Sequence, residues 1–335
     1  MTINGYCRLI IKVRQQMKAI QVKNAGGPEV LNLVHLPKPK IKTGWTLVKV
    51  KGFGINRSEI FTRRGYSPSV VFPRVLGIEC VGIVEETSDT QKFQVGQKVI
   101  SIMGEMGRDY DGSYAEYVLV PNNSLYAIDS NLSWQLLAAL PETFYTAYGS
   151  LKQLRISQND TVLVRAGSSG VGIAFLCLMK ALFPEVPVYA SVRNEKKCEE
   201  LKRLGFNDVF IEKNGKVMTH LTFSKMLDLV GPKTISDSIL LMTTGGIVCS
   251  SGQLGGQWFL RDFDPIDALK NNIYLTTFYS GNVNQASIQE LFTIISKNNV
   301  HIPEPKVFKL EEIQDAHYYL ENGESIGKAI VLLGE

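Results

Sequence analysis

The chain shows two different patterns of hydrophobic and polar positions, and the change between them falls near residue 130. From Met17 to about Ala127, short alternating or β-branched runs such as TLVKVKGFGIN and SYAEYVLV are separated by Gly and Pro. Short alternation between such breaks is typical of strands. The first pattern therefore predicts an irregular, β-rich domain that contains little helix.

From about Thr161 onward, apolar strands alternate with helical stretches. The predicted strands are TVLVRA, VPVYASV, DVFIE, MLDLVG and GGIVCSSG. In EKKCEELKRLG, Cys198, Leu201 and Leu204 recur at a near-helical spacing, and Gly205 suits the left-handed position that ends a helix. Strands alternating with helices predict βα units, and so an α/β fold with a parallel, doubly wound sheet covered on both faces.

A glycine-rich bend joins the first of these strands to the first helix, in VLVRAGSSGVGIAFLCLMKAL (162–182). Glycines permit a tight turn, a close approach to a ligand, and close packing of helix on strand. The helix N-terminus then offers N–H groups and a positive dipole end to a pyrophosphate. Such a bend can also serve packing alone, but its place at the first βα turn favours a dinucleotide-binding (Rossmann) domain. The residues assigned to the cofactor here are Gly167, Ser168, Ser169, Gly170, Val171 and Gly172.

The residues after the next strand indicate which dinucleotide is bound. An NAD binder usually carries a carboxylate about 20 residues beyond the glycines, where it holds the ribose 2′-hydroxyl. Here the strand ends in Ser191 and Arg193, and Lys197 follows. Cations at this position bind a 2′-phosphate with charge-assisted hydrogen bonds, so the sequence predicts NADPH. Glu195 is the nearby residue that opposes this interpretation.

Composition and charge exclude several classes of protein. A length of 335 residues suggests about two domains at roughly 150 residues each, and 44% hydrophobic residues are enough to form a core. The net charge of +4 comes from scattered residues, which predicts neither a nucleic-acid face nor a polybasic membrane patch. No apolar run approaches the roughly 18 residues of a membrane span. The charge balance by itself therefore predicts no partner.

The cysteines and the N-terminus bear on the cellular setting. The five cysteines are odd in number, lie far apart and form no CxxC, which argues against disulfides and thiolate zinc sites and favours a reducing, cytoplasmic setting. Residues 1–16 are basic and acid-free, but their apolar core is too short for a signal peptide. We interpret them as an extension before the first strand at Met17.

Several motifs, in order, resemble those of the medium-chain dehydrogenase/reductase superfamily. They are GFGINRSEIFTRRG (52–65), LGIECVGIVEE (76–86), VGQKVIS (95–101), GSYAEYVLVP (112–121), LPETFYTAYGSL (140–151), AGSSGVG (166–172) and GKAIVLL (327–333). Within that superfamily the chain resembles the zinc-independent quinone oxidoreductase branch. The resemblance implies a GroES-like catalytic domain (17–132), a Rossmann NADP-binding domain (133–280), and a C-terminal segment (281–335) that returns to the catalytic domain.

The departures from the family's zinc-dependent alcohol dehydrogenases concern the metal. Asn56 stands where those enzymes carry a cysteine ligand, Ile78 stands where they carry a histidine, and the third ligand position falls at Glu142. The loop that holds a structural zinc has no cysteines here. Asn and Ile cannot supply the sulfur and imidazole donors of catalytic zinc, so we predict that the protein uses no metal.

Without a Lewis acid, the substrate must already be electrophilic. A quinone or an α,β-unsaturated carbonyl accepts hydride at carbon and leaves charge on oxygen, which a hydrogen-bond donor stabilises. The catalytic candidates for this donor are Asn56, whose amide matches a family residue near the nicotinamide, and Tyr66, whose hydroxyl lies near a position that similar enoyl reductases use as proton donor. The resemblance also places Thr146 near the nicotinamide, and Gly252 is assigned to the cofactor site. Tyr66 could equally be a surface aromatic, and Thr146 could simply pack its methyl group inward.

Two other functions stay open at this point. An enoyl-thioester reductase would need a basic groove for carrier or CoA phosphates, for which Arg57, Arg63 and Arg64 are candidates. A non-enzymatic, crystallin-like or sensor protein would bind NADPH without turnover. Residues 271–280 (NNIYLTTFYS) carry no charge and predict an attractive sheet edge, which favours a homodimer built on this strand. The alternative is an edge covered by the helix that follows.

Overall fold

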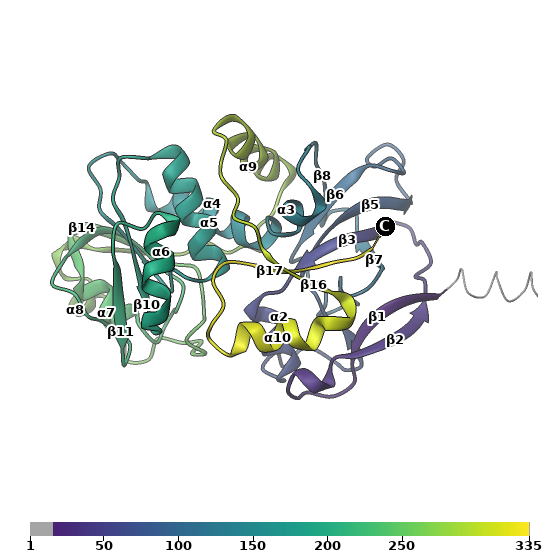
Figure 1. Cartoon of the computed structure of the whole chain (residues 1–335), viewed down its shortest axis with the longest axis horizontal. Coiled ribbons are helices and arrows are strands. Elements are labelled where there is room, and N and C mark those ends of the chain that lie inside the picture. Colours follow the sequence, from purple (N-terminus) through teal and green to yellow (C-terminus); the bar gives the residue numbers. More distant parts are fainter. Residues whose placement is uncertain (1–15, 335) are drawn as a thin grey trace, which may run out of the picture.

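The computed structural model describes residues 16–334. It shows two halves that lie side by side, the α/β half on the left and the β-rich half on the right (Figure 1). The predicted extension 1–16 lies outside this range except for Gln16. The α/β half, in teal and green, is built on one seven-stranded sheet with the order β12-β11-β10-β9-β13-β14-β15. All neighbours in it are parallel except β12, which runs antiparallel to β11. The predicted parallel sheet is thereby confirmed.

The bounds of the α/β half follow the predicted alternation of strands and helices. Its strands are β9 (Val162–Arg165), β10 (Val188–Val192), β11 (Val209–Lys213), β12 (Lys216–Val217), β13 (Phe223–Asp228), β14 (Met242–Ser250) and β15 (Tyr274–Thr276). Its helices are α4 (Pro141–Leu154), α5 (Gly170–Leu182), α6 (Cys198–Leu204), α7 (Ile235–Leu240), α8 (Pro265–Ala268) and α9 (Gln285–Lys297). Gly205 ends α6 with a φ of 118°, as its sequence position predicts.

The β-rich half, in purple and blue with the yellow elements of the C-terminal segment, contains two sheets. The smaller sheet joins β2 (Asn32–Pro37), β1 (Gln16–Val22) and β4 (Arg74–Val75). The larger one contains β3 (Trp45–Gly54), β5 (Glu79–Thr87), β6 (Lys98–Ile102), β7 (Tyr117–Pro121), β8 (Leu125–Ala127), β16 (Lys306–Lys309) and β17 (Ala329–Leu332). The remaining α-helices of this half are α2 (Arg57–Arg63), α3 (Trp134–Ala138) and α10 (Ile313–Glu321). Short 3₁₀ turns are Pro28–Val30, Glu195–Lys197, Lys270–Asn272 and Leu310–Glu312.

The C-terminal segment ties the two halves together. After α9 it crosses to the β-rich half, where β17 pairs antiparallel with β3 and places Ile330 opposite Gly54 (Figure 1). The largest hydrophobic cluster also spans both halves, because Ile78 and Val81 of the β-rich half pack with Phe144 and Tyr145 of α4. β17 of this segment therefore lies in the larger sheet of the β-rich half, while the proposed division of the chain, with boundaries at residues 132 and 280, stays a prediction.

The predicted edge strand is much shorter than the uncharged run 271–280. Only Tyr274–Thr276 pairs with the sheet, as its last strand, because Asn271 and Asn272 before it adopt left-handed backbone conformations. After it, the chain turns inward, and the ring of Phe278 lies directly against Gly149. The helix α9 packs on α4 and β8. Dimerisation through β15 stays a prediction.

Other sequence expectations concern thiols and membranes. Four of the five cysteines, Cys80, Cys177, Cys198 and Cys249, are described, and all four are free thiols. Cys7 lies outside the described residues. Among helices within residues 16–334, none combines the length and the apolar character that a membrane crossing requires.

A buried polar network fastens α10 of the C-terminal segment to α2. Arg63, whose side chain is completely buried, donates two hydrogen bonds to Glu321 at 2.8 and 2.9 Å and one to Nδ1 of His317 at 3.1 Å. Burial, helped by the charge of Arg63, lowers the pKa of His317 to about 3. The imidazole is therefore neutral, accepts from Arg63, and donates from Nε2 to the Tyr114 hydroxyl at 3.1 Å.

We expect Arg63→Met to lower the free energy of unfolding by about 3 kcal/mol, because it removes one partner of a buried ion pair. Arg203→Met is the matched control. Arg203 is 74% exposed and pairs with Glu200 within one helix, so its loss should cost less than about 1 kcal/mol. Urea unfolding of the three proteins measures both values, and equal losses in the two variants would contradict the assignment.

Candidate functional site

A buried ion pair lies where the C-terminal segment meets the β-rich half. The Lys328 ammonium, just before β17, donates to Oε1 of Glu79, the first residue of β5, at 2.6 Å. It also donates to Oδ1 of Asn56 at 2.6 Å. The side chain of Lys328 is 7% exposed and that of Glu79 is completely buried. These contacts bring three distant parts of the chain to one point.

Gly54, at the end of β3, makes room for this ion pair. A Cβ atom at this position would lie 2.2 Å from Cε of Lys328 and 2.3 Å from Oε1 of Glu79. Gly54 also faces Ile330 across the β3–β17 pair. Any side chain here would therefore displace the lysine, so this glycine is required by close approach and not by an unusual backbone conformation.

Glu59 lies in the first turn of α2, within hydrogen-bonding distance of Asn56. Its Oε2 accepts from the backbone N–H of Asn56 at 3.1 Å, and its Oε1 accepts from that of Ile78 at 3.2 Å. The residue is 1% exposed. Burial, followed by repulsion from the Glu79 carboxylate, raises the pKa of Glu59 to about 7. The Glu59 carboxyl group is therefore mostly neutral at pH values below about 7.

Glu142, in the first turn of α4, is the third carboxyl group of this cluster. Its backbone N–H donates to Oε2 of Glu79 at 2.7 Å. Its Oε1 accepts from the hydroxyl groups of Ser280 at 2.8 Å and Thr146 at 3.2 Å, while its Oε2 is shielded from solvent without a partner among the described residues. Burial, with a further contribution from Glu79, raises the pKa of Glu142 to about 7.

The predicted catalytic residues, Asn56 and Tyr66, and the predicted cofactor contact Thr146 lie at different places relative to this cluster. Asn56 and Thr146 are part of it, through Lys328 and Glu142 respectively. The Asn56 amide group is already engaged, because Nδ2 donates to Glu79 at 2.8 Å and to Glu59 at 3.4 Å. Its role as a donor to substrate stays a prediction.

Tyr66 lies outside the cluster, at the surface. It is 57% exposed, and its ring packs near Phe61 of α2 and Trp258 from the loop after β14. Phe61 and Trp258 also contact each other, with ring centroids 5.2 Å apart. The structure therefore places Tyr66 in an aromatic contact between the two halves, and its proton-donor role stays a prediction.

The ligand positions of the zinc-dependent relatives do not suit a metal in this chain. Asn56 Oδ1 faces the ammonium of Lys328, and Ile78 supplies only buried hydrocarbon. Within residues 16–334, no group of three or more His, Cys, Asp and Glu residues has a metal-binding arrangement. The donor set, with a cation already bound to Asn56 and Glu79, therefore does not fit catalytic zinc.

The glycine-rich bend has the predicted location, between β9 and α5, but its geometry differs from expectation. The tight turn is made by Ala166, whose φ is 58°, while none of the three glycines of the bend has a positive φ. Their role is close packing: a Cβ on Gly167 would lie 2.5 Å from Cβ of Ala190, and one on Gly172 would lie 2.7 Å from the Gly167 carbonyl oxygen. Ser169 caps α5 by accepting from the Gly172 N–H at 3.1 Å.

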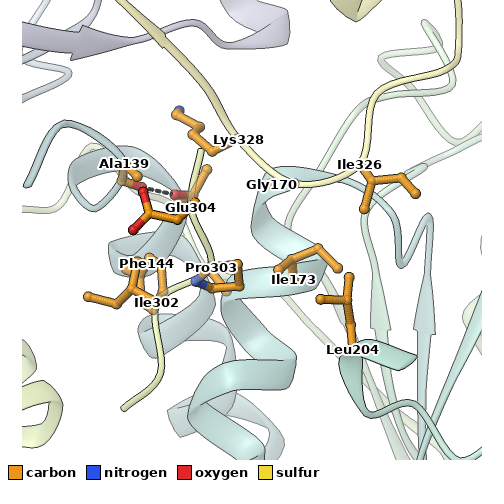
Figure 2. Close-up of a pocket in the computed structure, with 13 residues that line it drawn as sticks. Ala139, Phe144, Gly170, Ile173, Leu204, Ile302, Pro303, Glu304, Ile326 and Lys328 are labelled. Atoms are coloured by element: carbon orange, nitrogen blue, oxygen red, sulfur yellow. Dashed lines mark hydrogen bonds between the residues drawn. The ribbon is translucent and has the colours of Figure 1, made fainter. Parts of the chain in front are cut away.

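The C-terminal segment covers one side of this bend. Gly327 donates its N–H to the carbonyl oxygen of Ser168 at 2.9 Å. Figure 2 shows the adjoining pocket, where Ile326 and Lys328 extend from the segment beside Gly170 at the start of α5. The stem of Lys328 lines this pocket while its ammonium binds Glu79. Val171 lies in the same first helical turn.

The residues predicted to bind the ribose 2′-phosphate differ in their exposure and in their contacts. Arg193 is exposed, and Lys197 is 8% exposed and donates to Oγ of Ser168 at 3.2 Å and to the carbonyl of Ser325 at 2.7 Å. Burial, followed by the charge of Arg193, lowers the pKa of Lys197. Ser191 is completely buried, and its hydroxyl donates to Glu212 at 3.3 Å. Its contact with a cofactor stays a prediction.

The predicted cofactor residue Gly252 lies after β14. A Cβ at this position would lie 2.3 Å from the Leu229 carbonyl oxygen, so the glycine allows the loops that follow β13 and β14 to meet. Its cofactor role stays a prediction. The sequence analysis missed Glu59, Glu79, Ser280 and Lys328, and it treated Glu142 only as a vacant ligand position. A single lysine or glutamate among apolar residues does not change the periodic pattern, so the sequence gives no sign that these side chains meet at one site.

Two family models match the chain, in the order of the two halves. The model for the alcohol dehydrogenase GroES-like domain matches residues 42–130, and the model for zinc-binding dehydrogenase matches residues 204–331. Human quinone oxidoreductase is 25% identical over 336 residues, which cover 95% of this chain and 98% of that protein. The solved quinone oxidoreductase of Coxiella burnetii is 27% identical, with a TM-score of 0.81 over 95% of this chain and 100% of the other. A mycobacterial protein solved with NADPH gives the same TM-score and coverage at 24% identity.

These matches and the fold define the class of protein. The chain belongs to the medium-chain dehydrogenase/reductase superfamily, as a dinucleotide-binding oxidoreductase with a GroES-like domain. Within the superfamily it belongs to the quinone oxidoreductase-like branch. The family resemblance drawn from the sequence motifs is thereby confirmed.

The buried Glu59 should give the protein a distinctive pH dependence. Because its folded-state pKa of about 7 lies above that of an unfolded glutamate, the folded state alone keeps the proton between pH 4.5 and 7. The free energy of unfolding should therefore fall as the pH rises through this window, by on the order of 3 kcal/mol from this residue. In Glu59→Gln this contribution is absent. Between pH 4.5 and pH 8, the free energy of unfolding of the variant should therefore rise relative to that of the wild type.

Urea unfolding at pH 4.5 and pH 8 measures this shift. Glu185→Gln, at an exposed position, is the control and should follow the wild type at both pH values. A Glu59→Gln profile parallel to that of the wild type would show that Glu59 titrates normally in the folded protein.

Proposed function

We propose that the protein is a zinc-independent, NADPH-dependent oxidoreductase that reduces a quinone or an α,β-unsaturated carbonyl. One observation carries the proposal: the Lys328 ammonium, held by Asn56 and Glu79, lies among the positions where zinc-dependent relatives hold their metal. An ion pair there cannot coordinate an alcohol or carbonyl as a Lewis acid. The substrate must therefore be one that accepts hydride without metal activation.

The residues of the α/β half fit a dinucleotide. The first-turn N–H groups of α5 would receive the pyrophosphate. Lys197, which makes no ion pair with the described residues, and the exposed Arg193 would receive a ribose 2′-phosphate. When bound, the dihydronicotinamide supplies a hydride; the protein's task is then to position both reactants and to stabilise the charge left on oxygen.

The choice of NADPH over NADH is testable through Arg193. We expect NADPH to bind more tightly than NADH, and Arg193→Ala to narrow this difference by roughly 1 to 3 kcal/mol, the range for hydrogen bonds to charged groups. Fluorescence titration of both cofactors into both proteins measures it. Arg203→Ala, which removes an exposed cation on the neighbouring helix, should leave the difference unchanged. Equal wild-type affinities for the two cofactors would refute NADPH preference.

The enoyl-thioester reductase is less well supported than the quinone reductase. Of the three arginines considered for a phosphate groove, Arg63 and Arg64 are both bound to Glu321. Arg57 remains, with a buried Nε that has no partner among the described residues. A single available guanidinium makes a weak site for a polyphosphate group. A protein that binds NADPH without turnover has no specific observation in its favour.

An NADPH-oxidation assay separates these functions. We expect rapid oxidation with 1,4-benzoquinone, much slower oxidation with crotonyl-CoA, and no change after treatment with a chelator. Boiled protein and NADPH without acceptor control for non-enzymatic oxidation. Faster turnover of crotonyl-CoA would favour the thioester reductase, and tight NADPH binding without turnover of either would favour the non-enzymatic protein.

A further inference from the structure

Glu142 is held in an asymmetric way that sets it apart from the other carboxyl groups of the cluster. Its Oε1 accepts two hydrogen bonds, from Ser280 and Thr146, whereas its Oε2 accepts none among the described residues and is shielded from water. A buried carboxylate oxygen without a hydrogen-bond partner is destabilising. The structure avoids this cost only when Oε2 carries a proton or meets a donor.

The surrounding charges favour the protonated form. From β5, the Glu79 carboxylate faces Glu142 and raises its pKa; from the start of β17, the Lys328 ammonium lowers it. The ammonium, however, is already bound to Glu79 and Asn56. Burial is the largest effect and brings the pKa of Glu142 to about 7. A neutral carboxyl group is thus available at neutral pH.

The position of that proton follows from the hydrogen bonds. Because two hydroxyl groups donate to Oε1, the proton belongs on Oε2, where the O–H has no acceptor in the described part of the chain. Glu142 as a residue is only partly buried, although Oε2 itself is shielded from solvent. A carbonyl or quinone oxygen of a bound substrate would supply the missing acceptor.

We propose that Glu142 is the proton donor of the reaction, delivering the proton on Oε2 to the substrate oxygen as hydride reaches the substrate carbon. This inference rests on the proposed function. The carboxyl O–H bond breaks and a substrate O–H bond forms, while the substrate gains two electrons with the hydride from the dihydronicotinamide. A quinone thereby becomes the keto tautomer of a hydroquinone, which aromatises when a proton leaves the ring carbon that received the hydride and the second oxygen takes up a proton from solvent. The Glu142 carboxylate then takes up a proton from solvent, and Ser280 and Thr146 hold it in place through Oε1 meanwhile.

The first test is Glu142→Gln, which keeps the shape of the side chain and a hydrogen-bond donor but cannot release a proton. We expect kcat with benzoquinone to fall about 100-fold or more, as is typical for loss of a general acid, with little change in NADPH affinity. Wild-type kcat should fall as pH rises through about 7, because the donor is lost, and this limb should disappear in the variant. Glu142→Asp should recover part of the activity. Glu290→Gln, a half-exposed residue paired with Lys152, is the control and should behave as wild type.

The second test does not depend on turnover. Cyclohexanone, a carbonyl compound without a conjugated double bond, is titrated calorimetrically into the enzyme saturated with NADP⁺. Binding to wild type should weaken as the pH rises through about 7, because Oε2–H is lost, and binding to Glu142→Gln should not vary over this range. Thermal unfolding first establishes that each variant is folded.

The two tests separate failure of the inference from failure of the proposed function. A wild type that does not reduce quinones refutes the proposed function, while the carbonyl titration still decides whether Glu142 is a donor. A folded Glu142→Gln that keeps kcat within about threefold, with the same alkaline limb, overturns the inference. So does carbonyl binding with the same pH dependence in both proteins.

Discussion

The buried ion pair between Lys328 and Glu79 is the interaction on which the arrangement of the site depends. Burying two charges costs several kcal/mol per ion unless their remaining hydrogen-bonding groups are satisfied. Here Glu79 accepts from Lys328, from the Asn56 amide and from the backbone N–H of Glu142. Each donor comes from a different element, so the requirement to satisfy one carboxylate fixes the C-terminal segment, α2 and α4 relative to β5.

Besides burial, the Glu79 carboxylate of this pair raises the pKa values of its two neighbouring carboxyl groups. Three carboxyl groups, those of Glu59, Glu79 and Glu142, share a single buried ammonium. The lysine can compensate one of them by direct contact, and it contacts Glu79. Burial and repulsion from the Glu79 carboxylate raise the pKa of each of the other two to about 7, because together they outweigh the hydrogen bonds and the attraction of Lys328 that favour the charged forms. Such perturbed groups are typical of functional sites.

Four consecutive residues of the C-terminal segment, 325–328, connect the glycine-rich bend to the cluster of buried carboxyl groups. The Ser325 carbonyl accepts from Lys197, Gly327 donates to Ser168 in the bend, and Lys328 binds Glu79. A cofactor phosphate near Lys197 and a substrate near Glu142 would therefore both lie against residues that this segment holds in place. Its pairing with β3 anchors it from the opposite side.

The sequence alone determined the two halves, the parallel sheet, the bend before α5 and the family, because strand alternation, βα order and glycine spacing are local patterns. It also located the departures at Asn56 and Ile78. It overestimated the length of β15, because left-handed Asn271 and Asn272 and the inward turn at Phe278 depend on packing partners far along the chain. Only the tertiary structure brought Lys328, 249 residues from Glu79, into contact with it. Charges brought together by folding raise or lower pKa values through burial and proximity, and neither of these is encoded in local sequence.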